Sequence, residues 1–311
     1  MPHISVVAPV YRDEGNVREL CRRVKAAVSG ITEDFELILI EDGGRDRSWE
    51  YIREEARQDP RIRGIRFSRN FGQHYAITAG LDAARGDWTV VMDGDLQDRP
   101  EVIPDLYAKA QEGFEIVFVA RQGRPESWLY RTAQRIFYAL FRYLAGTDYD
   151  PAHGNFSIIS KQVLEHYRSL HEQLRFYGGI LAWLGFPRAS VPAQHGERHA
   201  GHSVYSLVSR LKLAAAIIIA HSDRPLRFSV ALGFLMALSA FAYGIYIILL
   251  ALFGGISVLG YASLMVSIYF VGGIILVVLG IIGIYVGKMY NETKHRPLYI
   301  IAEQTGPGAP R

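Results

Sequence analysis

Cysteine is nearly absent from this chain of 311 residues, because Cys21 is the only one. A single cysteine excludes an intramolecular disulfide framework and a cysteine-rich zinc site, and it suits a reducing compartment. Net charge is also small, at +3, with 34 basic residues against 31 acidic ones. So small an excess gives no reason to expect a nucleic-acid partner. Because 50% of the residues are hydrophobic, the sequence is not that of a disordered chain and can build a sizeable core.

Two common nucleotide-binding signatures are missing as well. The sequence contains no G-x-x-x-x-G-K-[ST], and no G-x-G-x-x-G follows its first apolar run. A P-loop NTPase and a dinucleotide-dependent dehydrogenase are therefore disfavoured.

Charge disappears entirely from Phe228 to Gly287, where no Asp, Glu, Lys, Arg or His occurs. Because a membrane span takes about 20 helical residues, this stretch predicts two transmembrane helices, near 228–253 and 261–287. A buried hairpin of a soluble protein is the alternative. Basic residues flank the pair and none lies in the hairpin between them, so both flanks are expected in the cytoplasm. The start of the chain lacks a signal peptide, which predicts an inner-membrane protein with a cytoplasmic N-terminal part.

The predicted spans suggest a division of the chain into four segments. We expect a catalytic domain at 1–205, a juxtamembrane amphipathic helix at 206–224, the transmembrane hairpin at 225–288 and a C-terminal tail at 289–311. A plain core helix is the alternative for the amphipathic segment.

The first 120 residues alternate short β-rich apolar runs with helical patterns, which is typical of a parallel sheet covered by helices. The predicted strands are 4–10, 35–40, 62–67, 88–92 and 116–120, and the predicted helices are 16–29, 48–58, 74–84 and 100–111. Ligands of such folds bind at the carboxyl ends of the strands.

Carboxylates follow two of these strands. Asp93-Gly94-Asp95 places two acidic side chains at the end of a strand, where they can bind Mg²⁺ or Mn²⁺ together with substrate phosphates. Asp42 ends another strand and can accept a hydrogen bond from a base or ribose. A solvated turn is the alternative for the first group, and helix capping or a turn is the alternative for Asp42.

An ordered series of motifs resembles family 2 glycosyltransferases of the GT-A (Rossmann-like) fold, specifically the polyprenyl-phosphate glycosyltransferases related to dolichyl-phosphate mannose synthase and the bacterial GtrB type. The resemblance covers most of the chain. The motifs are Pro9-Val10-Tyr11, Asp42-Gly43, Arg69-Asn70-Phe71-Gly72, Ala79-Gly80-Leu81-Asp82, Asp93-Gly94-Asp95-Leu96-Gln97-Asp98, Trp183-Leu184-Gly185-Phe186, Arg198, Gly201, Ser203, Tyr205, Pro225-Leu226-Arg227 and Arg296-Pro297-Leu298-Tyr299.

The resemblance implies a donor site and an acceptor site. In the donor site, Pro9, Tyr11, Asp13 and Asp42 would hold the nucleoside, Asp93, Gly94 and Asp95 would hold the metal and the diphosphate, and Gln97 would lie nearby. The acceptor lipid phosphate would be bound by Arg121, Arg131, Arg198 and Ser203. Guanidinium groups suit this task because they bind phosphate bidentately, although arginines also occur simply as surface charge. An amphipathic pattern at Trp128–Leu144 fits a helix at the bilayer surface beside the lipid.

The sequence departs from the family pattern at several positions. The family usually has Asn at Arg12, Asp at Glu41 and Ser at Gly44, and it often has Gly-Asp-Phe-Arg where Gly154-Asn155-Phe156-Ser157 stands here. That aspartate is a candidate catalytic base in the family, and Asn155, which stands in its place, cannot act as a base. The resemblance implies Asp93, Asp95, Gln97 and Asn155 as the residues at the catalytic positions. A phosphate monoester is already anionic near neutral pH, because its second pKa is about 6, so it needs no general base.

The predicted function is inverting transfer of one sugar from a nucleotide-diphosphate sugar, with a UDP-sugar favoured, to polyprenyl (undecaprenyl) phosphate at the cytoplasmic membrane face. The product would serve modification of cell-envelope glycans. The alternative is an inactive, membrane-anchored nucleotide-sugar binder or scaffold. Glycines in the second span favour a homo-oligomer, although such glycines also occur in monomers. They are Gly272, Gly273, Gly280, Gly283 and Gly287.

Overall fold

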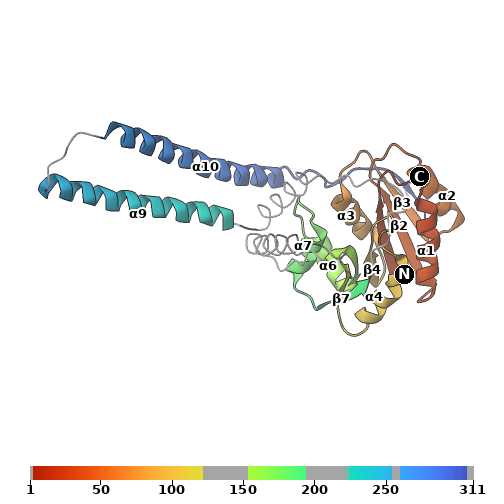
Figure 1. Ribbon diagram of the computed structural model, residues 1–311. Helices are drawn as coiled ribbons and strands as arrows, with labels where there is room; N and C mark the ends of the chain where they lie inside the picture. Colours follow the sequence, from red (N-terminus) through yellow and green to blue (C-terminus); the bar gives the residue numbers. More distant parts are fainter. Residues whose placement is uncertain (1–2, 122–152, 194–221, 223, 254–259, 307–311) are drawn as a thin grey trace, which may run out of the picture. The chain divides into compact units, whose positions relative to one another are not determined.

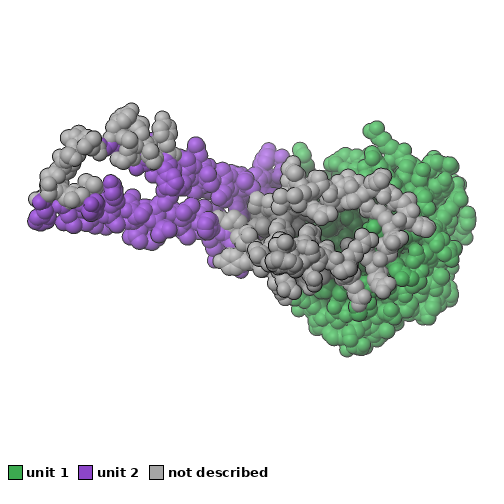
Figure 2. Space-filling model, viewed as in Figure 1, with its two compact units in different colours: residues 1–139, 147–207, 296–311 green, residues 140–146, 208–295 purple. Residues whose placement is uncertain are grey.

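The computed structural model describes residues 3–121, 153–193, 222, 224–253 and 260–306 (Figure 1). The chain forms two compact units, shown in different colours in Figure 2. Unit 1 comprises residues 1–139, 147–207 and 296–311, and unit 2 comprises residues 140–146 and 208–295. Most of the predicted juxtamembrane helix and all of the predicted helix at 128–144 lie outside the described residues.

Unit 1 is built on a sheet of eight strands in the order β7-β5-β6-β4-β1-β2-β3-β8. Strands β6 and β8 run antiparallel to their neighbours, and the other strands share one direction. The strands are β1 Ile4–Val10, β2 Phe35–Glu41, β3 Ile62–Phe67, β4 Trp88–Val91, β5 Ile116–Arg121, β6 His153–Ser160, β7 Arg188–Ala193 and β8 Ile301–Thr305.

Helices cover both faces of this sheet. The helices are α1 Val17–Ser29, α2 Ser48–Gln58, α3 Gln73–Ala83, the short 3₁₀ helix η1 Pro100–Val102, α4 Ile103–Ala110, α6 Lys161–Ser169 and α7 Tyr177–Leu184. Buried residues of α1, α2 and α4 form one apolar cluster with Val6 and Ala8 of β1. Buried residues of α3, α6 and α7 form a second cluster with Val7. Because neighbouring side chains of a strand point to opposite faces, the sheet lies between two apolar layers.

Two long apolar helices make up the described part of unit 2. They are α9 Arg224–Phe253 and α10 Tyr261–Thr293, and they contain candidate membrane spans at Leu226–Tyr246 and Phe270–Thr293. Only 6% and 0% of the two spans are buried inside the structure. A hairpin buried in a soluble core would hide these side chains, so their exposure favours the membrane interpretation. The predicted α/β fold, a mostly parallel sheet followed by two long apolar helices, is confirmed.

Glycines of α10 leave its surface open in a single chain. A Cβ atom added at Gly272, Gly280 or Gly283 would meet nothing within 4 Å. The predicted homo-oligomer stays a prediction.

The C-terminal segment does not end as a separate tail. Strand β8 pairs antiparallel with β3, in a register that runs from Gly64↔Thr305 to Phe67↔Ile301. The chain therefore leaves the sheet for unit 2 and returns to add an edge strand. The sequence prediction for 289–311 did not include this strand, which has only five residues that are almost all exposed.

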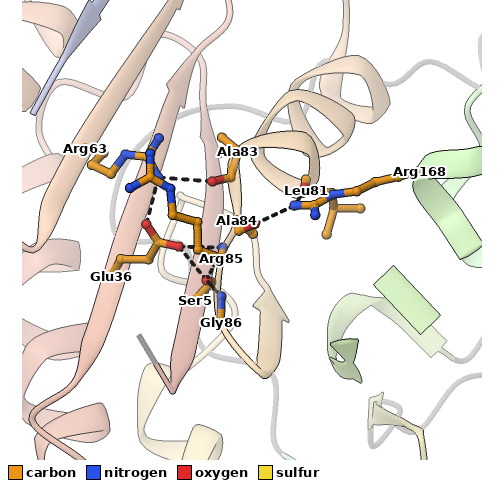
Figure 3. Close-up of polar contacts among 9 residues, drawn as sticks. All are labelled: Ser5, Glu36, Arg63, Leu81, Ala83, Ala84, Arg85, Gly86 and Arg168. Atoms are coloured by element: carbon orange, nitrogen blue, oxygen red, sulfur yellow. Dashed lines mark hydrogen bonds and ion pairs between the residues drawn. The ribbon is translucent and has the colours of Figure 1, made fainter. Parts of the chain in front are cut away.

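A buried carboxylate, Glu36, organises the amino-terminal edge of the sheet (Figure 3). Glu36 Oε1 accepts hydrogen bonds from Ser5 Oγ and from the backbone N–H of Arg85, both at 2.7 Å. Its Oε2 accepts a hydrogen bond from Arg63 Nη1 at 2.7 Å. Ser5 Oγ in turn accepts from the N–H of Gly86 at 2.8 Å. These hydrogen bonds stabilise the buried carboxylate of Glu36. They also connect β1, β2 and β3 to the loop that follows α3.

Two arginines hold the last carbonyl groups of α3, as Figure 3 also shows. Arg63 Nη1 donates to the carbonyl oxygen of Ala83 at 3.0 Å. Arg168 of α6 donates from Nε to the carbonyl oxygen of Leu81 at 2.9 Å, and its Nη2 donates to the carbonyls of Leu81 and Ala84. The last carbonyls of a helix have no partner within the helix, and cations stabilise that end. The carboxyl end of α3 is therefore fixed, and its amino end lies at the opposite edge of the sheet.

Candidate active site

A cavity of about 640 Å³ opens at the carboxyl ends of β1, β2 and β3. It is lined by Tyr11 and Arg12 after β1, by residues 43–45 after β2, by residues 66–70 at the end of β3, and by Ala302 of β8. A cavity therefore lies at the carboxyl ends of the strands, where the sequence analysis expects the ligand to bind. Of the residues predicted to bind the nucleoside, Tyr11 lines this cavity.

Tyr11 offers a ring at the cavity wall. Its side chain is 42% exposed, and the guanidinium carbon of Arg12 lies 5.2 Å from the ring centroid. Arg12 has a φ of 52°, a left-handed conformation that turns the chain sharply after β1. An exposed aromatic ring beside a cation can stack on a planar base.

Glycines allow the loops of this edge to approach closely. Gly43 has a φ of +63°, and a Cβ there would lie 2.1 Å from the carbonyl carbon of Arg69. A Cβ at Gly94 would lie 2.6 Å from the carbonyl oxygen of Pro9. Larger residues at either position would push apart the loops that follow the strands. The predicted site residues Pro9 and Gly94 therefore meet through their backbones.

Asp42 holds the loop before α3. Its carboxylate is buried and accepts hydrogen bonds from the backbone N–H groups of Phe71 at 2.7 Å and Gly72 at 2.9 Å. Burial raises the pKa of Asp42, and the two N–H groups offset part of that shift because they stabilise the ionised form. Asp42 is thus engaged by the chain itself, and its contact with a nucleoside stays a prediction.

Asp13 also has a partner within the chain. Asn16 Nδ2 donates to Asp13 Oδ1 at 2.5 Å, just before α1 begins at Val17. The backbone N–H of Asp13 donates to Ser48 Oγ at 3.2 Å. These contacts hold the turn after β1, and a role for Asp13 in binding the donor stays a prediction.

Asp93-Gly94-Asp95 forms a tight turn after β4. The N–H of Asp93 donates to Asp98 Oδ2 at 3.0 Å, and the N–H of Gln97 donates to Asp95 Oδ1 at 3.1 Å. Leu96 has a φ of 61°, which bends the turn back on itself. The predicted metal ligands and Gln97 therefore belong to one hydrogen-bonded turn.

The amino end of α3 contacts the ends of β2 and β4. Its key residue is Gln73, which the sequence motifs alone do not identify. Gln73, the first residue of α3, donates from Nε2 to Asp93 Oδ1 at 2.6 Å. The N–H groups of Phe71 and Gly72, just before it, bind Asp42. The only sequence signal for Gln73 is its position directly after the motif Arg69-Asn70-Phe71-Gly72.

Next to Gln73 lies a half-buried histidine, His74. Burial lowers the pKa of His74 to about 4, so the imidazole is neutral near pH 7. Its ring packs edge-on against Phe176, with centroids 5.4 Å apart. Its Nδ1 is buried without a hydrogen-bond partner among the residues that the structure describes.

Asn155 of β6 lies beside the acidic turn. Its Nδ2 is 3.5 Å from Asp93 Oδ1, a position that follows from the pairing of β6 with β4. Ser157 is buried, and its Oγ donates to the carbonyl oxygen of Asn155 at 3.0 Å and contacts the Tyr177 hydroxyl at 2.9 Å. The structure therefore brings Asn155, Gln73 and Asp93 together, and the hydroxyl of Ser157 is occupied by bonds within the chain.

Little of the predicted acceptor site can be placed. Arg121 is the last residue of β5, and nothing is described of its side chain. Arg131, Arg198 and Ser203 lie outside the described residues. Their binding of a lipid phosphate stays a prediction.

The acidic turn fits a divalent cation by its chemistry. Carboxylate oxygens are the ligands that Mg²⁺ and Mn²⁺ prefer. Within the described part of the chain, no group of three or more His, Cys, Asp or Glu side chains could enclose a metal ion. Mg²⁺ commonly binds through one or two carboxylates and substrate phosphates, so Asp93 and Asp95 suit an ion that arrives with a diphosphate.

The model of one protein family, Glycosyl transferase family 2, matches residues 5–168. The glycosyltransferase YkcC of Bacillus subtilis (strain 168) is 38% identical over 97% of this chain and 94% of its own length. The bactoprenol glucosyl transferase of Shigella phage SfV is 36% identical over 97% of this chain and 98% of its own length. The undecaprenyl-phosphate 4-deoxy-4-formamido-L-arabinose transferase of Edwardsiella ictaluri (strain 93-146) is 32% identical over 96% of this chain and 93% of its own length.

Similarity to a solved structure is more distant. The glucosyl-3-phosphoglycerate synthase of Mycobacterium tuberculosis, in complex with Mn²⁺, UDP-glucose and phosphoglyceric acid, superposes with a TM-score of 0.49 at 19% identity. The match covers 70% of this chain and 78% of that chain.

Proposed function

Because the chain belongs to glycosyl transferase family 2, we propose that it transfers one sugar from a nucleotide-diphosphate sugar to polyprenyl phosphate. The observation that carries this proposal is similarity over nearly the full length, apolar helices included, to proteins named for transfer to bactoprenol or to undecaprenyl phosphate. Those relatives share the lipid acceptor and differ in the sugar that their names state. The acceptor class is therefore better supported than the identity of the sugar, and UDP is the nucleotide that the sequence resemblance favours.

The donor would bind across the carboxyl edge of the sheet. The base would stack on Tyr11 in the cavity after β1, and the diphosphate would lie toward the turn at Asp93 and Asp95. A divalent cation held by these two carboxylates would neutralise charge that develops on the departing nucleoside diphosphate. Gln73 would keep Asp93 oriented through its hydrogen bond of 2.6 Å.

The lipid phosphate would act as the nucleophile. One of its oxygens forms a bond to the anomeric carbon while the bond from that carbon to the diphosphate breaks, and attack from the opposite face inverts the configuration. No proton has to be removed, because the second pKa of a phosphate monoester is about 6 and the oxygen is already anionic at neutral pH. A carboxamide at Asn155 is compatible with this chemistry, since positioning and charge neutralisation supply the rate enhancement.

This account predicts the behaviour of the Asn155→Asp variant. A carboxylate at this position would lie close to Asp93 and add negative charge beside the diphosphate. We expect kcat to stay the same or to fall by up to about tenfold. The acidic limb of the pH profile should follow the lipid phosphate near pH 6 in both proteins. The measurement is the rate of lipid-sugar formation from pH 5 to 9, and a clear rise in kcat for the variant would contradict the account in which no base takes part.

The two apolar helices would anchor the enzyme in the cytoplasmic membrane. Their length and composition suit two spans, and the basic residues that flank them support a cytoplasmic position for unit 1. The polyprenyl phosphate would then meet the donor at the membrane surface on that side.

The reaction can be tested with full-length protein in detergent. We would incubate it with undecaprenyl phosphate, Mg²⁺ or Mn²⁺, and a panel of UDP-, GDP- and CDP-sugars, and analyse the lipids by mass spectrometry. The expected result is a lipid heavier by one sugar, which is lost when EDTA is added. Nucleotide binding without product from any donor would contradict the proposal and favour the non-catalytic alternative.

A further inference from the structure

Residues 296–305, which we call the post-span segment, follow α10 and run along β3. The carbonyl oxygen of Ile300 accepts a hydrogen bond from the N–H of Ser68 at 3.0 Å, before the pairing of β8 with β3 begins. The ring of Tyr299 stacks on Phe67, with centroids 5.1 Å apart and planes 14° from parallel. The end of β3 is therefore held by both backbone and side-chain contacts.

Two further bonds connect the post-span segment to α3 and to the loop between α6 and α7. The hydroxyl of Tyr299 donates to Asp82 Oδ2, in α3, at 2.8 Å. The carbonyl oxygen of Arg296 accepts from Gln173 Nε2 at 3.1 Å. The segment is thus anchored before its strand begins, and its path along β3 is well defined.

The same part of β3 forms a wall of the candidate nucleotide cavity. Arg66, Phe67 and Ser68 all line the cavity, and each of them contacts the post-span segment. Ala302 of the segment lines the cavity directly. The cavity is incomplete without residues that the chain supplies only after α10.

Arg66 is held by carboxylates from two sides. Its Nη1 donates to Glu303 Oε1 of β8 at 2.9 Å, and its Nε lies 3.3 Å from Oε2 of the buried Glu41. Glu303 is itself oriented, because its Oε2 accepts a hydrogen bond from Trp49 Nε1 at 2.9 Å. Removal of Glu303 would leave Arg66 with one charged partner and free the guanidinium to move into the cavity.

We propose that the post-span segment is a positioning element of the donor site, and that Glu303 fixes the cavity wall by holding Arg66. This inference rests on the proposed binding of the donor nucleotide in that cavity. Glu303 acts through Arg66, so its loss should weaken nucleotide binding and leave the chemistry and the lipid acceptor unaffected.

The test compares full-length Glu303→Gln, Arg66→Gln and the double variant in detergent. The Glu303 side chain is 46% exposed, so its change to Gln removes the charge with little disturbance of packing. Glu112→Gln is the matched control, because it removes a carboxylate from an exposed ion pair with Lys109 on α4. We would measure affinity for UDP, GDP and CDP with Mg²⁺ by calorimetry, KM for donor and lipid, kcat and the melting temperature.

We expect Glu303→Gln to weaken nucleotide affinity and raise donor KM by about three- to tenfold, with kcat and lipid KM within about twofold of wild type. In the Arg66→Gln background the same change should add no further loss. Glu112→Gln should match wild type. Tyr299→Leu, which removes the stack on Phe67, should raise donor KM independently of Glu303.

Three outcomes separate the possibilities. A lower melting temperature with unchanged nucleotide affinity would make Glu303 merely structural and overturn the inference. Equal losses from Glu303→Gln with and without Arg66 would overturn the action through Arg66. Wild-type protein that binds none of the nucleotides would overturn the proposed function, and this inference with it.

Discussion

Asp93 and Asp95 are separated by one residue in the same turn, and their hydrogen-bond partners differ. Asp93 contacts the side chain of Gln73, whereas Asp95 Oδ1 accepts a hydrogen bond from the backbone N–H of Gln97. An asparagine at position 95 could still accept that bond with its amide oxygen. The charge of Asp95 can therefore be removed while the turn is kept.

We expect Asp95→Asn to lower kcat by at least about 100-fold, because it weakens the binding of the cation that neutralises the departing diphosphate. The melting temperature should stay within a few degrees of wild type. Turnover and thermal unfolding are the measurements, with Asp105→Asn on the exposed face of α4 as control. Near-normal turnover in Asp95→Asn would count strongly against a metal role for this turn.

His74 makes the stability of unit 1 depend on pH. Its pKa is lowered from 6.5 to about 4 by burial, so between these values the unfolded chain binds more protons than the folded chain. Stability should therefore fall as the pH decreases through this window, by on the order of 1–2 kcal/mol at pH 5. Thermal unfolding from pH 4 to 8 measures this slope.

His74→Phe keeps an aromatic ring against Phe176 and removes the titration. The variant should lose less stability than wild type between pH 7 and pH 5. The exposed His171→Phe is the control and should keep the wild-type slope. Identical slopes in wild type and His74→Phe would show that another group dominates the pH dependence.

At the scale of elements, α3 runs from the carboxyl ends of the parallel strands to their amino ends. Its carboxyl end is held by Arg63 and Arg168 (Figure 3), and its amino end supplies Gln73 to the acidic turn. A fixed helix can position both ends with the same precision. The arginines that are far from the site thus support the residues that form it.

We expect Arg168→Met to destabilise unit 1 by about 1–3 kcal/mol, because the carbonyls of Leu81 and Ala84 lose the guanidinium that donates to them. Chemical denaturation followed by fluorescence measures the change. Arg99→Met, which removes an exposed arginine, should have little effect. Equal stability of Arg168→Met and wild type would mean that water replaces the arginine at these carbonyls.

At the scale of the whole molecule, the chain is suited to mapping its topology with thiol reagents. Its only cysteine, Cys21, is buried, and burial raises the pKa of its thiol to about 12. Such a thiol reacts slowly because the thiolate is the reactive form. The native chain is therefore a nearly silent background for introduced cysteines.

We expect Ser257→Cys, in the predicted hairpin, to react with an impermeant maleimide added to intact spheroplasts. Thr293→Cys, at the end of α10, should react only after the membrane is opened, because both flanks of the pair are expected in the cytoplasm. Labelling is read as a mass shift on gels, with the unmodified chain as control. Labelling of Thr293→Cys in intact spheroplasts would reverse the proposed orientation.

Local pattern was enough to predict much of this molecule. The alternation of apolar runs predicted the first five strands and the helices between them to within one or two residues, and the absence of charge predicted α9 and α10. Each of these signals lies within one segment, because burial repeats with the period of the element that it stabilises. No strand was predicted after residue 120, so β6, β7 and β8 were missed. Strands β7 and β8 are edge strands with few buried residues, whereas β6 is a buried strand inside the sheet.

The arrangement of the site depended on contacts between distant segments. Asp42 meets the N–H of Phe71, Asp93 meets Gln73, and Arg66 meets Glu303 across 237 positions of sequence. No periodicity within a segment encodes these pairs, because strand order and register decide which ends come together. The sequence alone thus identified carboxylates that could do the chemistry, and folding added the partners that orient them.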